Sequence, residues 1–354
     1  MYDIIIVGGG PAGSTLARFL GKKYKILLLE KRTFAEGMPF PLQKSCGGLL
    51  DPDAQKMMAR FGLGIPKSVL LSPQMFAVRT IDITNHIERY YQRHYINIDR
   101  NEFDKWLLSI VPLEVDRAYG SLFMKLIENE DYVSVKYNYG GHNCEAKAKI
   151  IIGADGAFSA VRRQGMGDRC APELYLTIQE WFEAQENQNY YGAIFDNDIT
   201  DFYSWTIPKE NELILGTALK PGEEAHKKFK MLKERLCSYG YDFSKSIKRN
   251  GAYLYRPTNI KQVCTGKQRV ALAGEAAGFI SPSSAEGISY AFRSALALAS
   301  ALEDGIDGYE NRYIEYIHPL LKNIVLKNLK SPAMYNPFIR KCVMKTGLLS
   351  IDVV

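Results

Sequence analysis

The stretch KSCGGLL at residues 44–50 places a single thiol, Cys46, beside two glycines. A cysteine can bind a metal, form a disulfide, act as a nucleophile or pack against a bound molecule. The other cysteines are scattered and form no C-x-x-C pair: Cys144, Cys170, Cys237, Cys264 and Cys342. No Cys or His stands at zinc-ligand spacing, and no adjacent His would activate the thiol. The pattern therefore favours a residue packed against a ligand, or a small buried hydrophobe.

A second pattern is the glycine spacing Gly8-x-Gly10-x-x-Gly13. It follows the apolar run YDIIIVG, which predicts a buried strand, and opens a predicted helix, while Glu30 ends the next apolar run, KILLLEK. In such a unit the glycines form the turn, let a pyrophosphate approach the backbone and allow close helix–strand packing. The helix N-terminus attracts phosphate, and Glu30 can accept hydrogen bonds from both ribose hydroxyls of an adenosine. The dinucleotide site that we predict also includes Pro11, Ala12 and Lys31.

Three further stretches identify the dinucleotide. GADGAFSAVRR at 153–163 resembles the Asp-Gly motif of flavoprotein hydroxylases and their relatives. RVALAGEAAGFISPSSAEGISYAF at 269–292 resembles their motif whose acidic residue holds the flavin ribityl chain, and DRNEFDKWLL at 99–108 resembles their Asp-Arg…Phe-Asp segment. The resemblance implies FAD in a glutathione-reductase-type Rossmann domain. It assigns to the FAD site Arg100, Asp155, Gly156, Gly274, Glu275, Gly278, Gly287 and Ile288.

Within this p-hydroxybenzoate hydroxylase-type FAD superfamily, the chain resembles the geranylgeranyl reductase family, in particular its bacterial CbrA-like branch. The resemblance covers roughly residues 1–300. Beyond the FAD motifs it rests on KSCGGLL and on YSWTIPKENELILG at 203–216, which is similar to the family's Tyr-x-Trp-x-Phe-Pro-Lys box. Three positions depart from the family pattern: Ile207 replaces Phe, Glu275 stands where Asp is usual, and Ala285 replaces a glycine.

The family resemblance implies that Cys46 and Gly47 lie near the flavin isoalloxazine, where glycines allow close approach of the backbone. For Cys46 we rank a pocket-lining role first and proton donation second, with polarisation of the substrate also open. Packing as a small buried hydrophobe stays the competing interpretation. Arg100 is expected to contact a phosphate or ribose of FAD in preference to an ion pair with Asp99 or Asp104.

The resemblance also places Tyr203 and Trp205 at the substrate. Strand alternation puts Tyr203, Trp205 and Ile207 on one face, which fits an apolar, water-poor pocket. It fits equally well ordinary half-buried strand residues, because aromatic side chains favour strands.

The predicted fold is α/β, a Rossmann FAD-binding domain with an inserted, mostly antiparallel sheet domain and a helical C-terminus. A chain of 354 residues has room for this. The FAD-binding part is predicted at 1–70, 95–168 and 266–303, and the substrate-binding sheet at 71–94 and 169–265. Residues 304–354 are predicted to be helical, with breaks at Pro319, Pro332 and Pro337.

The charge of the chain is uneven along its length. The net charge of +6 does not by itself imply nucleic acid, and we expect none as a partner. From His318 to Leu349 there are Lys and Arg residues but no Asp or Glu, and apolar residues lie between them. This pattern fits helices resting on an anionic membrane surface, or a solvated basic face over ordinary packing. The absence of a signal-peptide pattern and of a spanning apolar run favours a cytoplasmic protein with reduced thiols, and the basic helices add the alternative of a peripheral position on the inner face of the membrane.

The expected function is an FAD-dependent oxidoreductase that reduces C=C bonds of a prenyl or isoprenoid lipid by hydride transfer. The first alternative is an FAD monooxygenase acting on an aromatic or polyketide-like substrate, and the second is a non-catalytic electron carrier or regulator. Only one glycine fingerprint is present, so the reductant is expected to be transiently bound NAD(P)H or a ferredoxin-like protein. No metal is expected, and the lone histidines are interpreted as structural.

Overall fold

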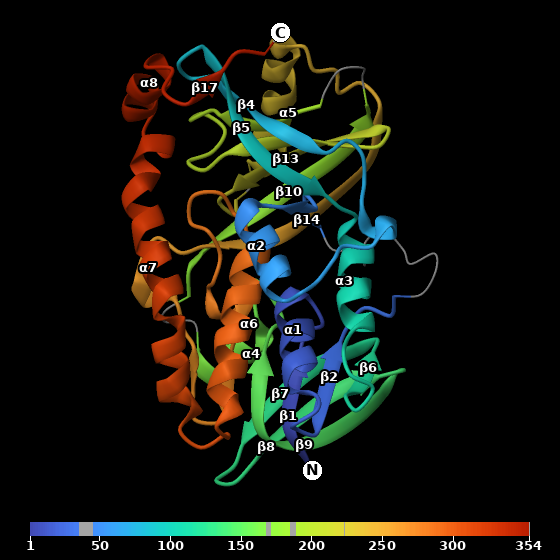
Figure 1. Cartoon of the computed structure of the whole chain (residues 1–354). Coiled ribbons are helices and arrows are strands. Elements are labelled where there is room, and N and C mark those ends of the chain that lie inside the picture. The colour runs from blue at the N-terminus through green and yellow to red at the C-terminus, as the bar shows by residue number, and fades with distance from the viewer. Residues whose placement is uncertain (35–44, 168–170, 185–188, 223, 354) are drawn as a thin grey trace.

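A computed structural model describes residues 1–34, 45–167, 171–184, 189–222 and 224–353. Lys44 of the KSCGGLL stretch lies outside the described residues. Two β-sheets with flanking helices form the α/β fold, and the long helix α7 (Tyr309–Tyr335) runs along one side of the molecule (Figure 1).

The first sheet has the parallel Rossmann core that the apolar runs predict. Its strand order is β15-β16-β9-β1-β2-β6, and β7 and β8 continue from β9 as an antiparallel meander. Ile4 to Val7 lie between two parallel neighbours, β2 and β9, so both faces of this strand are buried. Its strands are β1 (Tyr2–Val7), β2 (Ile26–Glu30), β6 (Asp116–Tyr119), β7 (Ser121–Glu128), β8 (Val133–Tyr139), β9 (His142–Gly153), β15 (Gly266–Lys267) and β16 (Val270–Leu272).

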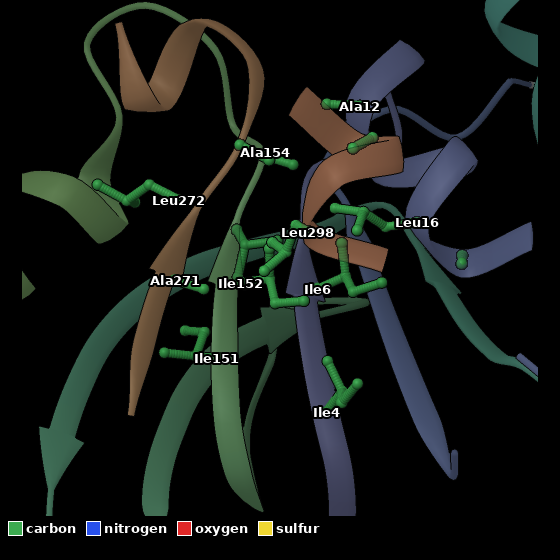
Figure 2. Packing of buried hydrophobic residues seen from close by; sticks show 14 of the residues in the cluster. Ile4, Ile6, Ala12, Leu16, Ile151, Ile152, Ala154, Ala271, Leu272 and Leu298 are labelled. Atoms are coloured by element: carbon green, nitrogen blue, oxygen red, sulfur yellow. The ribbon is translucent and has the colours of Figure 1, made fainter. Parts of the chain in front are cut away.

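Helices α1 (Pro11–Leu20) and α6 (Ile288–Glu303) pack against each other beside this sheet. Leu16 and Leu298 are fully buried among the strand isoleucines (Figure 2). Helix α3 (Arg100–Ser109) is capped by Asp99, whose carboxylate accepts hydrogen bonds from two backbone N–H groups of the first turn. The remaining helices of this part are α2 (Pro52–Arg60) and α4 (Ala160–Met166), with short 3₁₀ turns at Lys67–Val69, Ile260–Gln262 and Gly274–Ala277.

The second sheet is antiparallel except where β11 pairs with β4, which confirms a mostly antiparallel sheet. Its order is β14-β10-β13-β12-β11-β4-β5-β17, and β3 (Leu49–Leu50) also pairs with β5. The strands are β4 (Met75–Asp82), β5 (Ile87–Asn97), β10 (Glu173–Glu183), β11 (Tyr191–Phe195), β12 (Ser204–Lys209), β13 (Glu212–Leu219), β14 (Ser246–Arg256) and β17 (Ser350–Ile351). Both segments predicted for the substrate domain enter this sheet, and β3 and β17 join it from outside them. The domain boundaries themselves stay a prediction.

The two faces of the second sheet carry different side chains. One face packs on helix α5 (Ala225–Leu236), which buries Phe229, Leu232 and Leu236, and a 3₁₀ turn follows at Cys237–Tyr239. The other face carries a cluster rich in aromatic rings, which we call the aromatic cluster. Its buried members include Tyr95, Tyr175, Trp181, Phe195, Phe202, Tyr203, Trp205, Ile207 and Ile214.

The C-terminal region differs from its prediction. Helix α7 continues through Pro319 and Pro332, and only Pro337 starts a new helix, α8 (Pro337–Lys345). An interior proline costs roughly 3 kcal/mol through its lost hydrogen bond and its ring clash. The buried side chains of Tyr313 and Leu320, packed in the core formed with α6, offset this cost. The predicted helix breaks at Pro319 and Pro332 were therefore wrong.

Candidate functional site

The first glycine turn has the geometry that a dinucleotide site requires. Gly8 has φ of +104°, and a side chain there would overlap Ala154 at the end of β9. A Cβ at Gly13 would overlap the carbonyl oxygen of Gly8, so this glycine permits the close packing of α1 on β1. At Gly10, in contrast, no atom of the described residues beyond its chain neighbours lies within 4 Å of the Cβ position. This open space in front of the α1 N-terminus fits a pyrophosphate that approaches the backbone.

The other FAD motifs converge on this turn. A Cβ at Gly274 would lie 3.0 Å from Cβ of Ala12, so the predicted ribityl motif packs against the start of α1. Asp155 accepts hydrogen bonds from Oγ of Ser159, the N-cap of α4, and from the backbone N–H of Ala160 in the first turn of that helix. The remaining predicted residues of these motifs lie as follows: Gly156 in the turn before α4, Gly278 just after the 3₁₀ turn, and Gly287 and Ile288 at the start of α6.

Glu275, the longer acidic residue of the ribityl motif, accepts a hydrogen bond from the backbone N–H of Tyr255 at 3.0 Å. Its Oε1 thus holds the end of β14 beside the first sheet, a bond between two segments that the prediction assigned to different domains. The contact of Glu275 with FAD stays a prediction.

Glu30 is buried and already hydrogen-bonded. Its Oε2 accepts from the backbone N–H of Gly9 at 2.7 Å, and Arg32 donates to both carboxylate oxygens through its backbone N–H and its guanidinium. Burial alone would raise the pKa of Glu30, but the charge and hydrogen bonds of Arg32 lower it. A ribose hydroxyl would have to displace one of these donors, so the predicted ribose contact stays a prediction. Lys31, the next predicted residue, is exposed.

Arg100 forms a buried ion pair with Asp104, at 2.9 Å from Nε to Oδ1. The sequence interpretation ranked this pairing below a contact with FAD; the pair is formed, and the FAD contact stays a prediction. Asp104 also accepts from Arg32 Nη1 at 2.7 Å, and these two guanidinium groups lower its pKa against the effect of burial. Arg100 Nη1 lies 3.3 Å from Cys46 Sγ. A chain of buried ion pairs therefore runs from Glu30 in the first sheet through Arg32, Asp104 and Arg100 to the Cys46 thiol.

Lys209 is the functional-site residue that the sequence interpretation left without a role. Its buried ammonium donates to the carbonyl oxygens of Gly48 and Ile98, each at 2.9 Å, and to Oδ1 of Asn97. Burial lowers the pKa of Lys209 to about 7, against the opposing charges of Cys46 and Asp99. In the sequence, the match of Lys209 to the Tyr-x-Trp-x-Phe-Pro-Lys motif was the signal that could have identified it. Only the fold shows that its side chain contacts the Cys-Gly-Gly turn.

The Gly47–Gly48 turn packs closely on protein groups, and its approach to the flavin stays a prediction. A Cβ at Gly47 would overlap Cδ1 of Ile207, and one at Gly48, where φ is +62°, would overlap the carbonyl oxygen of Ile98. The backbone N–H of Gly48 lies 3.4 Å from Cys46 Sγ. The turn, the thiol and strand β12 thus form one packed unit.

Cys46 opens onto a pocket with a volume of about 120 Å³. Arg100, Lys209, Trp181 and Ile214 contribute to its wall. Ligand sites for drug-sized molecules usually have volumes of roughly 300–1,000 Å³. The pocket beside the thiol is therefore smaller than the usual site for a ligand of that size.

Tyr203, Trp205 and Ile207 lie together in the aromatic cluster, which confirms that they share one face of the strand. Each is at most 7% exposed. The Tyr203 hydroxyl donates to the carbonyl oxygen of Ser284 at 2.6 Å and accepts from Tyr191 at 3.2 Å. The cluster therefore joins the second sheet to the loop that precedes α6.

Glu286 was missed in the sequence, although it directly precedes the predicted Gly287. Its carboxylate accepts hydrogen bonds from Arg93 Nη2 at 2.6 Å, from Tyr95 Oη at 3.1 Å and from Ser284 Oγ at 2.7 Å. Burial and the Glu286 charge raise the pKa of Asp51, the N-cap of α2, to about 7. This polar network borders the aromatic cluster through Tyr95.

The residues present fit FAD: an open space before a helix N-terminus, close glycine packing, and a convergence of the flavin motifs on it. Among the residues that the structure describes, no group of His, Cys, Asp and Glu is placed to hold a metal ion. Within the same residues, no helix has both the length and the hydropathy to cross a membrane.

Relatives and solved structures agree with this arrangement. A family profile described as an FAD binding domain matches residues 1–175. A structure from Thermoplasma acidophilum described as geranylgeranyl bacteriochlorophyll reductase-like has a TM-score of 0.79 at 19% identity, covering 100% of this chain and 92% of its own. The p-nitrophenol 4-monooxygenase of Pseudomonas putida has a TM-score of 0.67 at 17% identity, covering 100% and 99%. At these identities the likeness shows the fold.

Two curated relatives are similar over nearly their full lengths. Protein CbrA of Escherichia coli is 38% identical over 350 residues, which cover 99% of this chain and 98% of the relative. Protein CbrA of Shigella flexneri is also 38% identical over 350 residues, covering 99% and 94%. The chain therefore belongs to the family of the bacterial CbrA proteins, and its first 175 residues match an FAD binding domain.

Proposed function

We propose that the protein reduces C=C bonds of a prenyl-type lipid, with FAD as its cofactor. The observation that carries the proposal is the aromatic cluster next to the Cys46 turn, where Ile207 contacts the position of Gly47. An unactivated alkene is a poor hydride acceptor, so a dry pocket that positions it accounts for much of the catalysis. The geranylgeranyl reductase-like description of the Thermoplasma structure supports this substrate class.

FAD, when bound and reduced, supplies a hydride to one alkene carbon. The aromatic cluster holds the apolar chain and excludes water, with Tyr203 fixed by its bond to Ser284. Cys46 lines the pocket at the reacting carbons. In its second role, its S–H donates a proton to the other alkene carbon. The guanidinium of Arg100, 3.3 Å from Sγ, then stabilises the thiolate that remains.

Hydroxylation is the competing function, because the p-nitrophenol 4-monooxygenase shares the fold along the whole chain. The fold does not separate the two reactions, since each depends on the pocket and the added substrate. The proposed electron donor, transiently bound NAD(P)H or a ferredoxin-like protein, applies to either.

The test uses the purified FAD-loaded protein with its flavin reduced by dithionite in the absence of oxygen. A geranylgeranyl lipid in detergent is added, flavin reoxidation is followed by absorbance, and the product is weighed. Reoxidation without oxygen and a gain of two hydrogens per turnover are expected. A flavin that stays reduced until air enters, followed by a product gaining one oxygen, would assign a monooxygenase. A flavin that no substrate reoxidises would favour an electron carrier or regulator.

The two roles of Cys46 separate in the same assay. Cys46→Ala is expected to slow anaerobic reoxidation by about tenfold or more if the thiol donates a proton, and Cys46→Ser to restore part of the rate. An equal, small decrease of the reoxidation rate in both variants would exclude proton donation and leave Cys46 with the pocket-lining role. Cys237→Ala, at an exposed cysteine after α5, is the matched control.

A further inference from the structure

Helices α7 and α8 lie along one side of the molecule (Figure 1), and both carry large apolar side chains that are exposed. Leu329 and Phe338 are each 73% exposed, and Leu349 is 81% exposed. Monomeric proteins seldom expose contiguous apolar patches of this kind without a partner. We call this surface the α7–α8 face; its exposed apolar residues are Val325, Leu326, Leu329, Phe338, Ile339, Val343, Leu348 and Leu349.

The same face carries unbalanced positive charge. Between Tyr316 and Ile351 the sequence contains no Asp or Glu. Of the basic residues there, Arg340 is buried against Asp82 at 2.7 Å, and Lys327 turns inward to Ser281 at 3.1 Å. The others, Lys322, Lys330, Lys341 and Lys345, are exposed. Two of the six basic side chains therefore bind groups of the protein itself, and the other four are exposed to solvent together with the apolar side chains.

We propose that the α7–α8 face docks on an anionic membrane surface. Exposed leucine and phenylalanine side chains enter the boundary between headgroups and acyl chains, while lysines reach the anionic headgroups with their flexible stems. A second copy fits less well, because a two-fold contact would place lysines of one face close to those of the other. The charge complementarity therefore selects the membrane as the occupant.

The inner side of the same helix reaches the candidate site. Tyr335, near the end of α7, donates a hydrogen bond to the carbonyl oxygen of Ser283 at 2.5 Å, and its ring packs on Phe202 of the aromatic cluster. Docking would place the bilayer against a helix that also covers the aromatic cluster. The docking proposal does not depend on the lipid being the substrate.

The test measures sedimentation of the full-length, FAD-loaded protein with vesicles of phosphatidylcholine alone or mixed with phosphatidylglycerol. Binding is expected only to the anionic vesicles, and it is expected to weaken when salt rises from about 0.15 M to about 0.5 M. Replacing the four exposed lysines by Gln is expected to reduce binding roughly tenfold or more. Leu329→Ser with Phe338→Ser is expected to reduce it while leaving the net charge unchanged.

The matched control is Lys227→Gln with Lys230→Gln, because these lysines are also exposed, on α5, but each lies beside a glutamate. This control is expected to bind like the unmodified protein, and thermal melting confirms that every variant is folded. Equal binding to neutral vesicles, or no loss in the lysine variant, would overturn the proposal. So would a dimer in solution that Leu329→Ser with Phe338→Ser dissociates, because the face would then bind a second copy. Flavin reoxidation is a separate readout, so failure of docking does not count as failure of the proposed reaction.

Discussion

Two glycine turns border the candidate site, and different forces hold them. The turn from Gly8 to Gly13 is set by backbone contacts, because a Cβ at Gly8 or at Gly13 would overlap a backbone carbonyl oxygen. The turn at Gly47 and Gly48 is held by a buried ammonium, that of Lys209. Both turns should therefore respond to added volume, and the second should respond also to charge and pH.

The largest effect should come from adding one carbon to the first turn. Gly13→Ala would place Cβ against the carbonyl oxygen of Gly8, and we expect a loss of about 3 kcal/mol in the free energy of unfolding. Gly10→Ala is the matched control, because open space surrounds its Cβ position. It should leave the apo protein about as stable while weakening FAD binding at least tenfold, measured by flavin fluorescence. Equal destabilisation by both variants would contradict the backbone account.

A smaller loss should follow from removing the ammonium at the second turn. Lys209→Met leaves three buried acceptors, on Gly48, Ile98 and Asn97, without their donor, and we expect a cost of about 2 kcal/mol. Because the turn loses its clamp, Cys46 should also react faster with a thiol reagent. Lys248→Met, at a lysine lining the same pocket, is the control and should change neither quantity as much.

The Lys209 clamp should also be sensitive to pH. Its pKa is about 7 when folded and near 10.5 when unfolded, so the unfolded chain binds more protons between these values. Stability contributed by this group therefore rises from pH 7 to pH 10, by at most about 1.4 kcal/mol per pH unit. Urea unfolding of protein with and without Lys209→Met, both carrying Cys46→Ala to remove thiol titration, measures the difference. A difference independent of pH would refute the lowered pKa.

The smallest effect concerns two carboxylates beside the aromatic cluster, those of Asp51 and Glu286. The pKa of Asp51 is about 7 in the folded protein, above the ordinary 3.8. The folded protein therefore binds more protons than the unfolded chain between these values, and stability falls as the pH rises from about 4 to about 7. Asp51→Asn preserves the cap of α2 and should raise stability at pH 8 by about 1 kcal/mol, with less gain at pH 5. Asp99→Asn, at the cap of α3, is the control and should show no gain at pH 8.

Much of the fold follows from short sequence patterns. The apolar runs identified the parallel strands, and alternation correctly placed Tyr203, Trp205 and Ile207 on one face. The patterns failed at Pro319 and Pro332, because local propensity predicts a break while tertiary packing of α7 carries the helix through both. In the candidate site, the glycine turn was predictable from its spacing between a strand and a helix, although the contact that requires Gly8 comes from the distant Ala154.

The sequence by itself determined the Rossmann turn, the order of the flavin motifs and the aromatic strand, because each depends on the spacing of nearby residues. Only the tertiary structure decided how Cys46 is held. Arg32 meets Asp104 across 72 positions and Lys209 meets Gly48 across 161, so their partners are chosen by packing of distant segments. It also decided which basic residues of the C-terminal helices face outward, since Arg340 is buried against Asp82 although the charge pattern treats it like its neighbours. Periodicity reports which side of an element is buried, but the partner of a buried charge depends on where the rest of the chain folds.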